Sequence, residues 1–377
     1  MTANPILVQA LRGGFLESEH RGAVAVVDAG GSLHSAWGDI DRPIFPRSAV
    51  KVLQALPLVE SGAAERFGLN DEELALACAS HGGEAAHVAT AAAMLAKAGV
   101  DVHALECGTH WPYHDGSTKA LAAAGQLPCA LNNNCSGKHS GFVCLGCLMS
   151  EQIGTDSDRR AFLRGYVKPE HPVMREVSAA LQAATGWNLA NTPVGTDGCS
   201  IPAYAVPLRH LAHAFARVAT GQGLSPGRAN AAQRLRAAVA AAPFMVAGSG
   251  RFDTRVMQRL GARVFCKVGA EGVYCAALPT LGLGVAVKMD DGNTARACEV
   301  VMAALIERLL PLDSEDAAFM HGFSHAVMRN WNGIEVGRLQ PAGPLNGQGA
   351  RQVAVTSKAQ VRSIATDLRT PPDDVSN

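Results

Sequence analysis

A serine and a lysine near the start of the first predicted helix could together perform acyl-transfer chemistry. Ser48 and Lys51 lie three residues apart in the stretch PRSAVK at positions 46–51. A helix beginning there would put both side chains on one face, one turn apart. A serine nucleophile needs a base of this kind within reach. An ordinary helix start with a surface lysine has the same pattern, so the pair alone is weakly specific.

A second serine and a second lysine follow later in the chain. Lys267, followed by Gly269, lies on a predicted strand with apolar residues before it. A lysine on a core strand is unusual because burying an ammonium group is costly, although the solvated face of an edge strand would accept one. Ser80 precedes Gly82 and Gly83, where a ligand could approach the backbone. An isolated serine at a helix end is more often only a polar terminus.

The elements that must position these residues change in type twice along the chain. Strand-like runs occur at 6–11, 23–27, 32–37, 263–267, 272–278, 282–289 and 334–339. Alanine-rich helical patterns occupy the middle, at 48–57, 70–80, 85–98, 172–184, 205–218 and 229–241, and a further helix follows Asn293. Gly30-Gly31 and the short joints between the later strands favour antiparallel pairing.

These patterns predict an α/β (α+β) fold in one catalytic domain, residues 1–340. An antiparallel sheet formed by both chain ends, about 1–45 and 262–340, would hold an inserted helical region, about 46–261. The tail at 341–377 is polar and poor in large apolar residues, so we expect it to be loosely ordered.

Composition excludes several classes of partner. Lys+Arg and Asp+Glu both number 33, and this balance argues against nucleic acid or an anionic membrane as a partner. No apolar run reaches the length of a membrane span, and no basic-then-apolar leader opens the chain. Ten cysteines without such a leader predict thiols or metal ligands, not disulfides. We therefore expect a cytoplasmic protein.

Two resemblances follow from the order of the motifs. A hairpin, Ser-x-x-Lys, a helical insertion and a strand with Lys-x-Gly resemble the serine β-lactamase and penicillin-binding fold. More narrowly, the chain resembles the rhizobial-type L-asparaginases of the asparaginase II family. Five pieces carry this second resemblance: PRSAVK at 46–51, CASHGGE at 78–84, NCSGKHSG at 134–141, GTDGC at 195–199 and KVGAEG at 267–272.

The family resemblance implies a specific site. It pairs Ser48 with Lys51 and Ser80 with Lys267, and it implies a homodimer. It also implies a zinc ion, with Asp197 close by, that is expected to aid substrate affinity more than turnover. The implied zinc ligands are Cys135, Lys138 and Cys199, whereas residue types alone would favour His139 over Lys138 as the third ligand.

The implied reaction is hydrolysis of the side-chain amide of L-asparagine. A serine would attack the amide carbon and form an acyl-enzyme, which water then hydrolyses. The lysine must be neutral to take the serine proton, and a second ammonium group nearby would lower its pKa. Arg47 could pair with the α-carboxylate and Asp197 or Glu84 with the α-ammonium, and His139 is a further candidate for substrate binding.

Other functions remain open on the sequence. A glutaminase or another serine amidase could use the same scaffold, and a β-lactamase or esterase is a more distant alternative. A non-enzyme alternative is a zinc-binding module in which the serines are structural. Cys144 and Cys147 have the spacing of a redox motif but lie in an apolar helix, so we expect them in the core.

Overall fold

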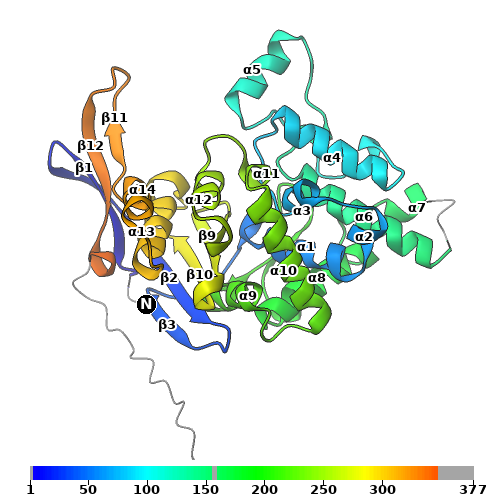
Figure 1. Cartoon of the computed structure of the whole chain (residues 1–377), viewed down its shortest axis with the longest axis horizontal. Helices are drawn as coiled ribbons and strands as arrows, with labels where there is room; N and C mark the ends of the chain where they lie inside the picture. Colours follow the sequence, from blue (N-terminus) through cyan, green and yellow to red (C-terminus); the bar gives the residue numbers. More distant parts are fainter. Residues whose placement is uncertain (1–2, 155–158, 347–377) are drawn as a thin grey trace, which may run out of the picture.

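An antiparallel sheet formed by the two ends of the chain organises the computed structural model, which describes residues 3–154 and 159–346 (Figure 1). Its strand order is β11-β12-β1-β2-β10-β9-β8, and β3 pairs with β2. The strands are β1 (Ile6–Arg12), β2 (Phe15–Asp28), β3 (Leu33–Trp37), β8 (Phe265–Val268), β9 (Val273–Leu278), β10 (Leu283–Met289), β11 (Val327–Arg329) and β12 (Glu335–Pro341).

This topology confirms the predicted antiparallel sheet from both chain ends. Every recorded strand pair is antiparallel, and β2 joins the two ends by pairing with β10, where Val26 lies opposite Val285. Two features differ from the prediction. The strand β2 is much longer than the predicted 23–27, because it continues from the β1–β2 turn at Gly13-Gly14, and β11 was not predicted at all.

The region between β3 and β8 is mainly helical, with two small strand pairs that the sequence did not predict. The pairs are β4 (Pro43–Ile44) with β7 (Val206–Pro207), and β5 (Val194–Thr196) with β6 (Pro202–Tyr204). The helices are α1 (Lys51–Glu60), α2 (Ala63–Arg66), α3 (Asp71–Ala77), α4 (Ala85–Lys97), α5 (Asp115–Ala123), α6 (Ser136–Gln152), α7 (Arg159–Leu163), α8 (Pro172–Thr185), α9 (Leu208–Thr220), α10 (Pro226–Ala241), α11 (Phe244–Ala247) and α12 (Phe252–Leu260). The later helices α13 (Glu299–Leu309) and α14 (Ser314–Ser324) pack together, and α13 also contacts β1 and β12.

Local chemistry explains most of these boundaries. Asn70 caps α3, since its side chain accepts from the backbone of Glu73 and the Glu73 carboxylate accepts in return. Pro57 lies inside α1 and does not end it as predicted. Helix α5 was not predicted; it has no buried residue and projects from the body of the molecule (Figure 1).

Close packing brings the two halves of the site together. Helix α9 covers β2, β9 and β10, and Gly284 lets it approach, because a Cβ there would lie 1.9 Å from the carbonyl oxygen of Ala212. The edge strand β8 packs against α12 and against η1 (Arg47–Val50), the 3-10 turn that precedes α1. The segment with Ser48 therefore contacts the strand with Lys267.

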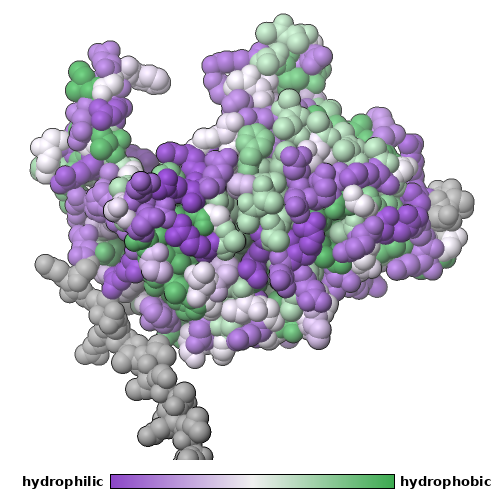
Figure 2. Space-filling model, in the orientation of Figure 1, coloured by the Kyte–Doolittle hydropathy of each residue, from purple (hydrophilic) through white to green (hydrophobic). Residues whose placement is uncertain are grey.

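The molecular surface and the C-terminal end of the chain concern the predictions about a membrane span and a loosely ordered tail. The visible face mixes hydrophilic and hydrophobic side chains (Figure 2), and none of the described helices has the length and apolar character needed to cross a bilayer. Within the predicted tail, residues 343–345 form a short 3-10 turn, and residues 347–377 lie outside the described part. The extent of a single domain stays a prediction.

Candidate active site

A cavity of about 360 Å³ lies where η1, the end of β8 and several loops of the helical region meet. It receives both predicted serines and two of the predicted zinc ligands. Its lining consists of Arg47, Ser48, Ser80, His110, Tyr113, Asn133, Asn134, Cys135, Asp197, Gly198, Cys199, Arg251, Val268, Gly269, Ala270 and Thr294.

Two lysines converge on the hydroxyl of Ser80 at this cavity. The Nζ atoms of Lys51 and Lys267 each lie 2.9 Å from Ser80 Oγ. Both lysines are buried, with 1% and 0% of their surface exposed. The backbone N–H of Ser80 donates to the carbonyl of Val246, which fixes the serine in place. The structure therefore brings together three of the four predicted catalytic residues by direct contact.

Burial changes the proton affinity of Lys267. Removal from water lowers the pKa of Lys267 to about 7, the ammonium of Lys51 acts in the same direction, and the carboxylate of Asp253 opposes both. Nζ of Lys267 has two partners, Ser80 Oγ and the carbonyl of Val268 at 2.8 Å. An amine with a pKa near 7 is present in both protonation states at neutral pH, so Lys267 is suited to accept a proton.

Lys51 has a fuller set of partners. Its Nζ contacts the Ala79 carbonyl at 2.5 Å and Cys135 Sγ at 3.1 Å, in addition to Ser80. Three acceptors match the three protons of an ammonium group. Ser48 borders the same cavity, but in the described structure its hydroxyl has no hydrogen bond with Nζ of Lys51; the two residues are joined only through the Lys51 backbone N–H, which donates to the Ser48 carbonyl. The reason is local: Ser48 lies on a 3-10 turn, and the Lys51 side chain extends inward to Ser80.

An ion pair spans the cavity lining. Arg47 contacts Asp197 Oδ1 through Nη2 at 2.8 Å and through Nε at 3.0 Å. Burial raises the pKa of Asp197, but the Arg47 hydrogen bond and the charge of Lys138 outweigh it, so this pKa lies below its usual value. Arg47 has φ +50°, a strained backbone for a residue with a side chain. Gly269 allows the approach, since a Cβ there would lie 2.6 Å from the Pro46 carbonyl oxygen.

The three predicted zinc ligands form one buried cluster. Lys138 Nζ lies 3.0 Å from Cys199 Sγ, and the thiols of Cys135 and Cys199 share a hydrogen bond. That bond lowers the pKa of Cys135, assisted by the charges of Lys51 and Lys138. The same bond, assisted by burial, raises the pKa of Cys199, so one proton serves both sulfur atoms. Burial lowers the pKa of Lys138, but the two sulfurs more than offset this and raise it.

These donors fit a zinc ion in type and proximity. Two thiol sulfurs and one amine converge from α6 and from the loop after β5, and the sulfurs face the cavity. In residues 3–154 and 159–346, no group of three or more His, Cys, Asp or Glu side chains could hold a metal. A metal here would therefore need the amine of Lys138 in its neutral form.

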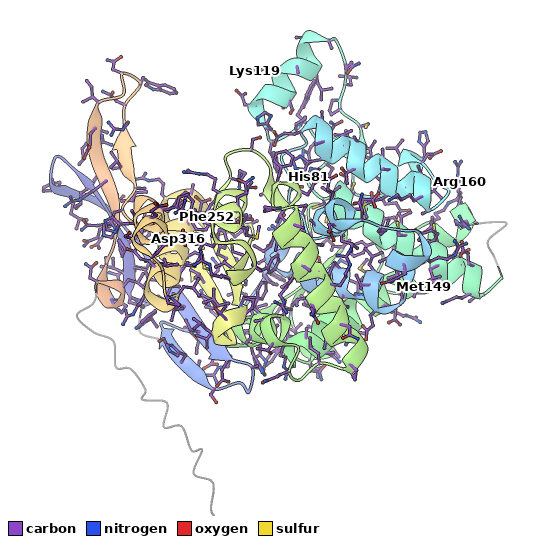
Figure 3. The ribbon with its side chains drawn as sticks, viewed as in Figure 1. His81, Lys119, Met149, Arg160, Phe252 and Asp316 are labelled. Atoms are coloured by element: carbon purple, nitrogen blue, oxygen red, sulfur yellow. The ribbon has the colours of Figure 1, made fainter. Side chains whose placement is uncertain are left out.

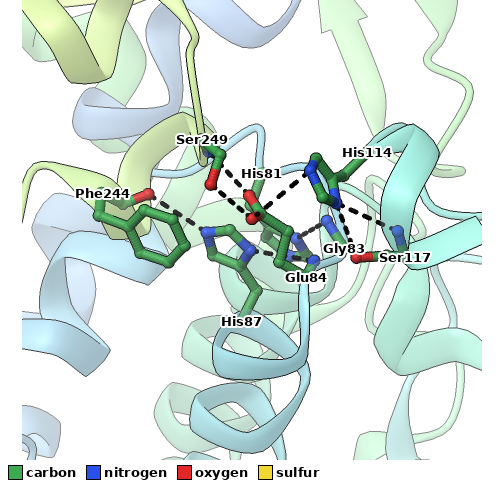
Figure 4. Close-up of polar contacts among 8 residues, drawn as sticks. All are labelled: His81, Gly83, Glu84, His87, His114, Ser117, Phe244 and Ser249. Carbon is green, nitrogen blue, oxygen red and sulfur yellow. Dashed lines mark hydrogen bonds and ion pairs between the residues drawn. The ribbon is translucent and has the colours of Figure 1, made fainter. Parts of the chain in front are cut away.

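Glu84 and His139 lie outside the cavity lining. Glu84 accepts from the backbone N–H of Ser249 at 2.8 Å and from its hydroxyl at 2.6 Å, and His114 approaches the same carboxylate at 3.9 Å (Figure 4). His139 is fully buried, and its Nδ1 lies 2.6 Å from the hydroxyl of Tyr166. Both residues therefore support the structure around the site and do not face a ligand in the cavity. Cys144 and Cys147 are buried, as predicted.

One charged residue at the cavity could not be identified from the sequence. Arg251 immediately precedes α12, lines the cavity and is exposed. Its carbonyl accepts from the N–H of Arg255, but its guanidinium has no hydrogen bond or ion pair with another described residue, whereas the guanidinium of Arg47 is already paired. A lone arginine before a helix carries no local pattern, so only the tertiary structure identifies it.

A family model described as L-asparaginase II matches residues 8–341. The chain belongs to this family. The resemblance inferred from five motifs is thus confirmed at the level of the family, and membership supports a hydrolase acting on amides.

Solved structures resemble this L-asparaginase II family member only distantly. "Crystal Structure Analysis of Mglu in its native form" shares 18% identity with a TM-score of 0.34, over 78% of this chain and 66% of that chain. "Crystal Structure Analysis of Mglu in its tris and glutamate form" shares 17% with a TM-score of 0.34, over 82% and 65%. The chain thus spans about two thirds of the length of these structures. No curated protein matches it.

Replacement of Glu84 tests its structural role. Glu84→Ala removes both bonds to Ser249 and is expected to reduce the free energy of unfolding by about 1–3 kcal/mol. Burial raises the pKa of Glu84, but the Ser249 bonds outweigh it and lower that pKa. The stabilisation is therefore complete above about pH 4.5 and is lost as the pH falls below it. Urea titration at pH 7 and pH 3.5 measures this.

Glu176 on α8 provides the matched control, because it is exposed and makes no recorded hydrogen bond. Glu176→Ala should leave stability within about 0.5 kcal/mol at both pH values. Equal stability of Glu84→Ala and the wild type at pH 7 would contradict the role given to Glu84.

Proposed function

We propose that this protein hydrolyses the side-chain amide of L-asparagine to L-aspartate and ammonia (EC 3.5.1.1), with a serine acyl-enzyme and a lysine base. The single observation that carries the proposal is the hydroxyl of Ser80 between two buried lysines at a small polar cavity, in a member of the L-asparaginase II family. A lysine with a pKa of about 7 supplies the neutral amine that this chemistry requires.

The steps balance without any other reactant than water. The serine oxygen bonds to the amide carbon as its proton passes to the lysine nitrogen. Return of that proton to the amide nitrogen releases ammonia and leaves an ester. Water, deprotonated by the same lysine, then attacks the ester carbon, and the proton returns to the serine. The products are free enzyme and L-aspartate.

Two assignments of the attacking hydroxyl follow from the contacts. Ser80 has the direct contact with Lys267, whose pKa suits a base. Ser48 lines the same cavity, and its hydroxyl makes no hydrogen bond with another described residue, which leaves its oxygen free to attack. In that second arrangement Ser80 would pass a proton between Lys51 and Lys267 and so prepare Lys51 as the base for Ser48.

Charged groups around the cavity suit a zwitterionic substrate. Asp197 can receive the α-ammonium while it remains close to Arg47. Arg251, the unpaired guanidinium at the cavity, can receive the α-carboxylate bidentately. In a bound zwitterion, the α-ammonium would face the Asp197 carboxylate and the α-carboxylate would face the Arg251 guanidinium. Arg251 therefore joins Arg47 and Asp197 as a proposed substrate-binding residue.

We also propose that Cys135, Lys138 and Cys199 hold zinc. When bound, the ion would act as a Lewis acid and orient polar substrate groups. Their burial and mutual contacts support the proposal, as does the position of both sulfurs on the cavity wall. The three side chains would then serve affinity, while Ser80 and the two lysines perform the proton transfers.

The proposal also includes predictions about the fold, the assembly, the location and a second substrate. A serine β-lactamase-like arrangement is supported by the position of Ser48 on η1, the turn before α1, and of Lys267 on the returning sheet. A homodimer is supported by exposed apolar residues on the β11–β12 hairpin, where Trp331 and Ile334 reach solvent. We retain a cytoplasmic location as a prediction. L-Glutamine is the second candidate substrate, because a cavity of about 360 Å³ has room for one more methylene group.

Substitution of the two serines tests the mechanism. Ser80→Ala and Ser48→Ala should each reduce kcat for asparagine by at least about a thousandfold, because each removes a hydroxyl of the proton path or the nucleophile. Ammonia release measures the rate. Peptide mapping of acid-quenched wild-type enzyme locates the aspartyl ester on one serine and thereby assigns the attack.

Ser178→Ala is the control, since that hydroxyl contacts only Tyr204, away from the cavity. It should retain the wild-type rate. Absence of ammonia release from asparagine and from glutamine would reject the amidohydrolase and favour the zinc-binding module. Full activity of both serine variants would reject the acyl-enzyme.

The proposed contact of Arg251 with the α-carboxylate predicts which substrates bind less tightly when Arg251 is replaced. Arg251→Ala should raise KM for asparagine about 10- to 100-fold, with a smaller change in kcat, since a charge-assisted contact to the α-carboxylate is lost. Succinamate, which keeps the carboxylate, should suffer the same loss. β-Alaninamide, which lacks it, should be hydrolysed equally by both enzymes.

Arg296→Ala is the matched control, because Arg296 is exposed near the cavity but does not line it. It should leave all three substrates unaffected. A loss for β-alaninamide as large as that for asparagine would show that Arg251 has a structural role instead.

Metal analysis tests the zinc proposal. Purified protein should contain about one zinc per chain by mass spectrometry, and Cys135→Ser or Cys199→Ser should lose it. Cys144→Ser, which changes a buried thiol outside the cluster, should retain it. Chelation should raise KM more than it lowers kcat, and loss of the maximal rate at unchanged affinity would contradict the proposed role.

A further inference from the structure

One buried carboxylate near Lys267 has no part in the reaction as described so far. Asp253 is the second residue of α12 and follows Phe252, which is labelled in Figure 3. Only 1% of the surface of Asp253 is exposed. Its Oδ2 accepts from the backbone N–H of Val268 at 3.3 Å. Its Oδ1 is buried and has no partner among the described residues. A buried carboxylate oxygen without a partner is costly, so this position calls for a functional explanation.

Val268 connects this carboxylate to the lysine. The N–H of Val268 donates to Asp253, and its carbonyl accepts from Nζ of Lys267 at 2.8 Å. The same Nζ contacts Ser80. Asp253 therefore holds the backbone of Val268, whose carbonyl in turn binds Nζ of Lys267. Loss of this bond would remove one of the contacts that hold the end of the edge strand β8, where Val268 also pairs with Tyr274.

Asp253 differs in charge from the other groups that surround Lys267. Among the ionisable groups that act on Lys267, Asp253 is the carboxylate, whereas the others are cations or cysteine thiols. The groups acting on or around Lys267 are Lys51 on α1, Cys135 before α6, Cys78 after α3, Cys266 on β8, Cys275 on β9, and Arg251 and Asp253 at the start of α12. Asp253 in turn faces Lys267, Arg251, Cys266 and Glu299, the first residue of α13.

Asp253 has local support for its negative charge. It lies in the first turn of α12, where the helix dipole favours an anion. Burial raises the pKa of Asp253 above its usual value, and the charge of Lys267, the Val268 N–H and Arg251 oppose this rise without cancelling it. Removal of the carboxylate charge would leave the sulfur of Cys135 to favour the ammonium form of Lys267, against burial and the cations Lys51 and Arg251, which favour its neutral form.

We propose that Asp253 is a positioning residue for this reaction: its buried carboxylate anchors the end of β8 and supplies the counter-charge that keeps Lys267 able to hold and release a proton beside Ser80. The inference rests on the proposed function for its catalytic meaning. The coupling between the two side chains is a property of the folded protein and can be measured without substrate.

Asp253→Asn separates the charge from the shape. The amide oxygen can still accept from Val268, but the negative charge is gone. NMR of protein labelled at the lysine side chains follows the titration of Lys267, one of eight lysines, with Lys267→Met to assign its signal. The Lys267 midpoint should fall by about one pH unit, and the acid limb of the kcat/KM profile should move to lower pH by the same amount.

Glu299→Gln is the matched control, because it removes a partly buried acid that faces Asp253 and Arg251 but does not act on Lys267. Its Lys267 midpoint should stay within a few tenths of a unit of wild type. Asp253→Ala should show the same shift as Asp253→Asn together with a lower kcat, since the anchor to Val268 is also lost.

An unchanged Lys267 midpoint in Asp253→Asn would overturn the proposal. If that variant does not fold, carboxyl carbon NMR of the wild type decides instead: an Asp253 carboxylate at pH 7 supports the proposal, and a carboxyl that stays protonated from pH 5 to 9 overturns it. Absence of amidohydrolase activity would reject the proposed function alone, because the NMR midpoints would still report the coupling.

Discussion

The convergence of two buried ammonium groups on one serine hydroxyl is the constraint on which the rest of this structure depends. Lys51 comes from the first helix after the N-terminal strands, and Lys267 comes from the strand by which the chain returns to the sheet. Two like charges this close to each other are stable in the interior only if each has fixed polar partners. The fold supplies them by closing the sheet with both chain ends and packing η1 directly on β8.

The partners of the two lysines differ, and the difference gives them different tasks. Lys51 is surrounded by a carbonyl, a hydroxyl and the sulfur of Cys135, whose pKa is lowered. Lys267 has fewer acceptors and a pKa of about 7. Lys51 is therefore held by three fixed acceptors, whereas Lys267 is suited to exchange a proton. Asp253 and the sulfur of Cys135 both act on Lys267 and both favour its ammonium form.

The sequence predicted the parts of this arrangement that depend on local pattern. Alternating apolar runs and glycine turns located the returning strands within two residues, and the Asn70 cap located α3. Three features were beyond such patterns. Helix α5 lacks a buried face, β11 is three residues long, and the partner of Lys51 depends on a 3-10 turn. A 3-10 turn also places residues three apart on one face, so the spacing alone did not decide the partner of Lys51, whose long side chain reaches Ser80 instead.

The site residues that could be predicted from the sequence are those that lie within a recognisable motif. Ser80, Cys135, Asp197 and Lys267 lie in recognisable pieces of sequence and meet at the cavity or beside it. Arg251 and Asp253 lie in no such piece, because their importance comes from what tertiary packing leaves unpaired near them. Glu84 shows the converse: it lies within a motif, but its carboxylate is used to hold Ser249.

The pKa of Lys267 also bears on how the product leaves. In the proposed reaction, hydrolysis of a neutral amide creates a second carboxylate beside Ser80, so the product is more negative than the substrate at the atoms next to the lysines. Two permanent ammonium groups there would bind the product more tightly than the substrate and slow turnover. The new carboxylate favours the ammonium form of Lys267, but the burial that lowers the pKa of Lys267 to about 7 opposes this, so tight product binding carries the cost of protonating a buried amine. The same burial that suits Lys267 to act as a base would therefore limit product retention.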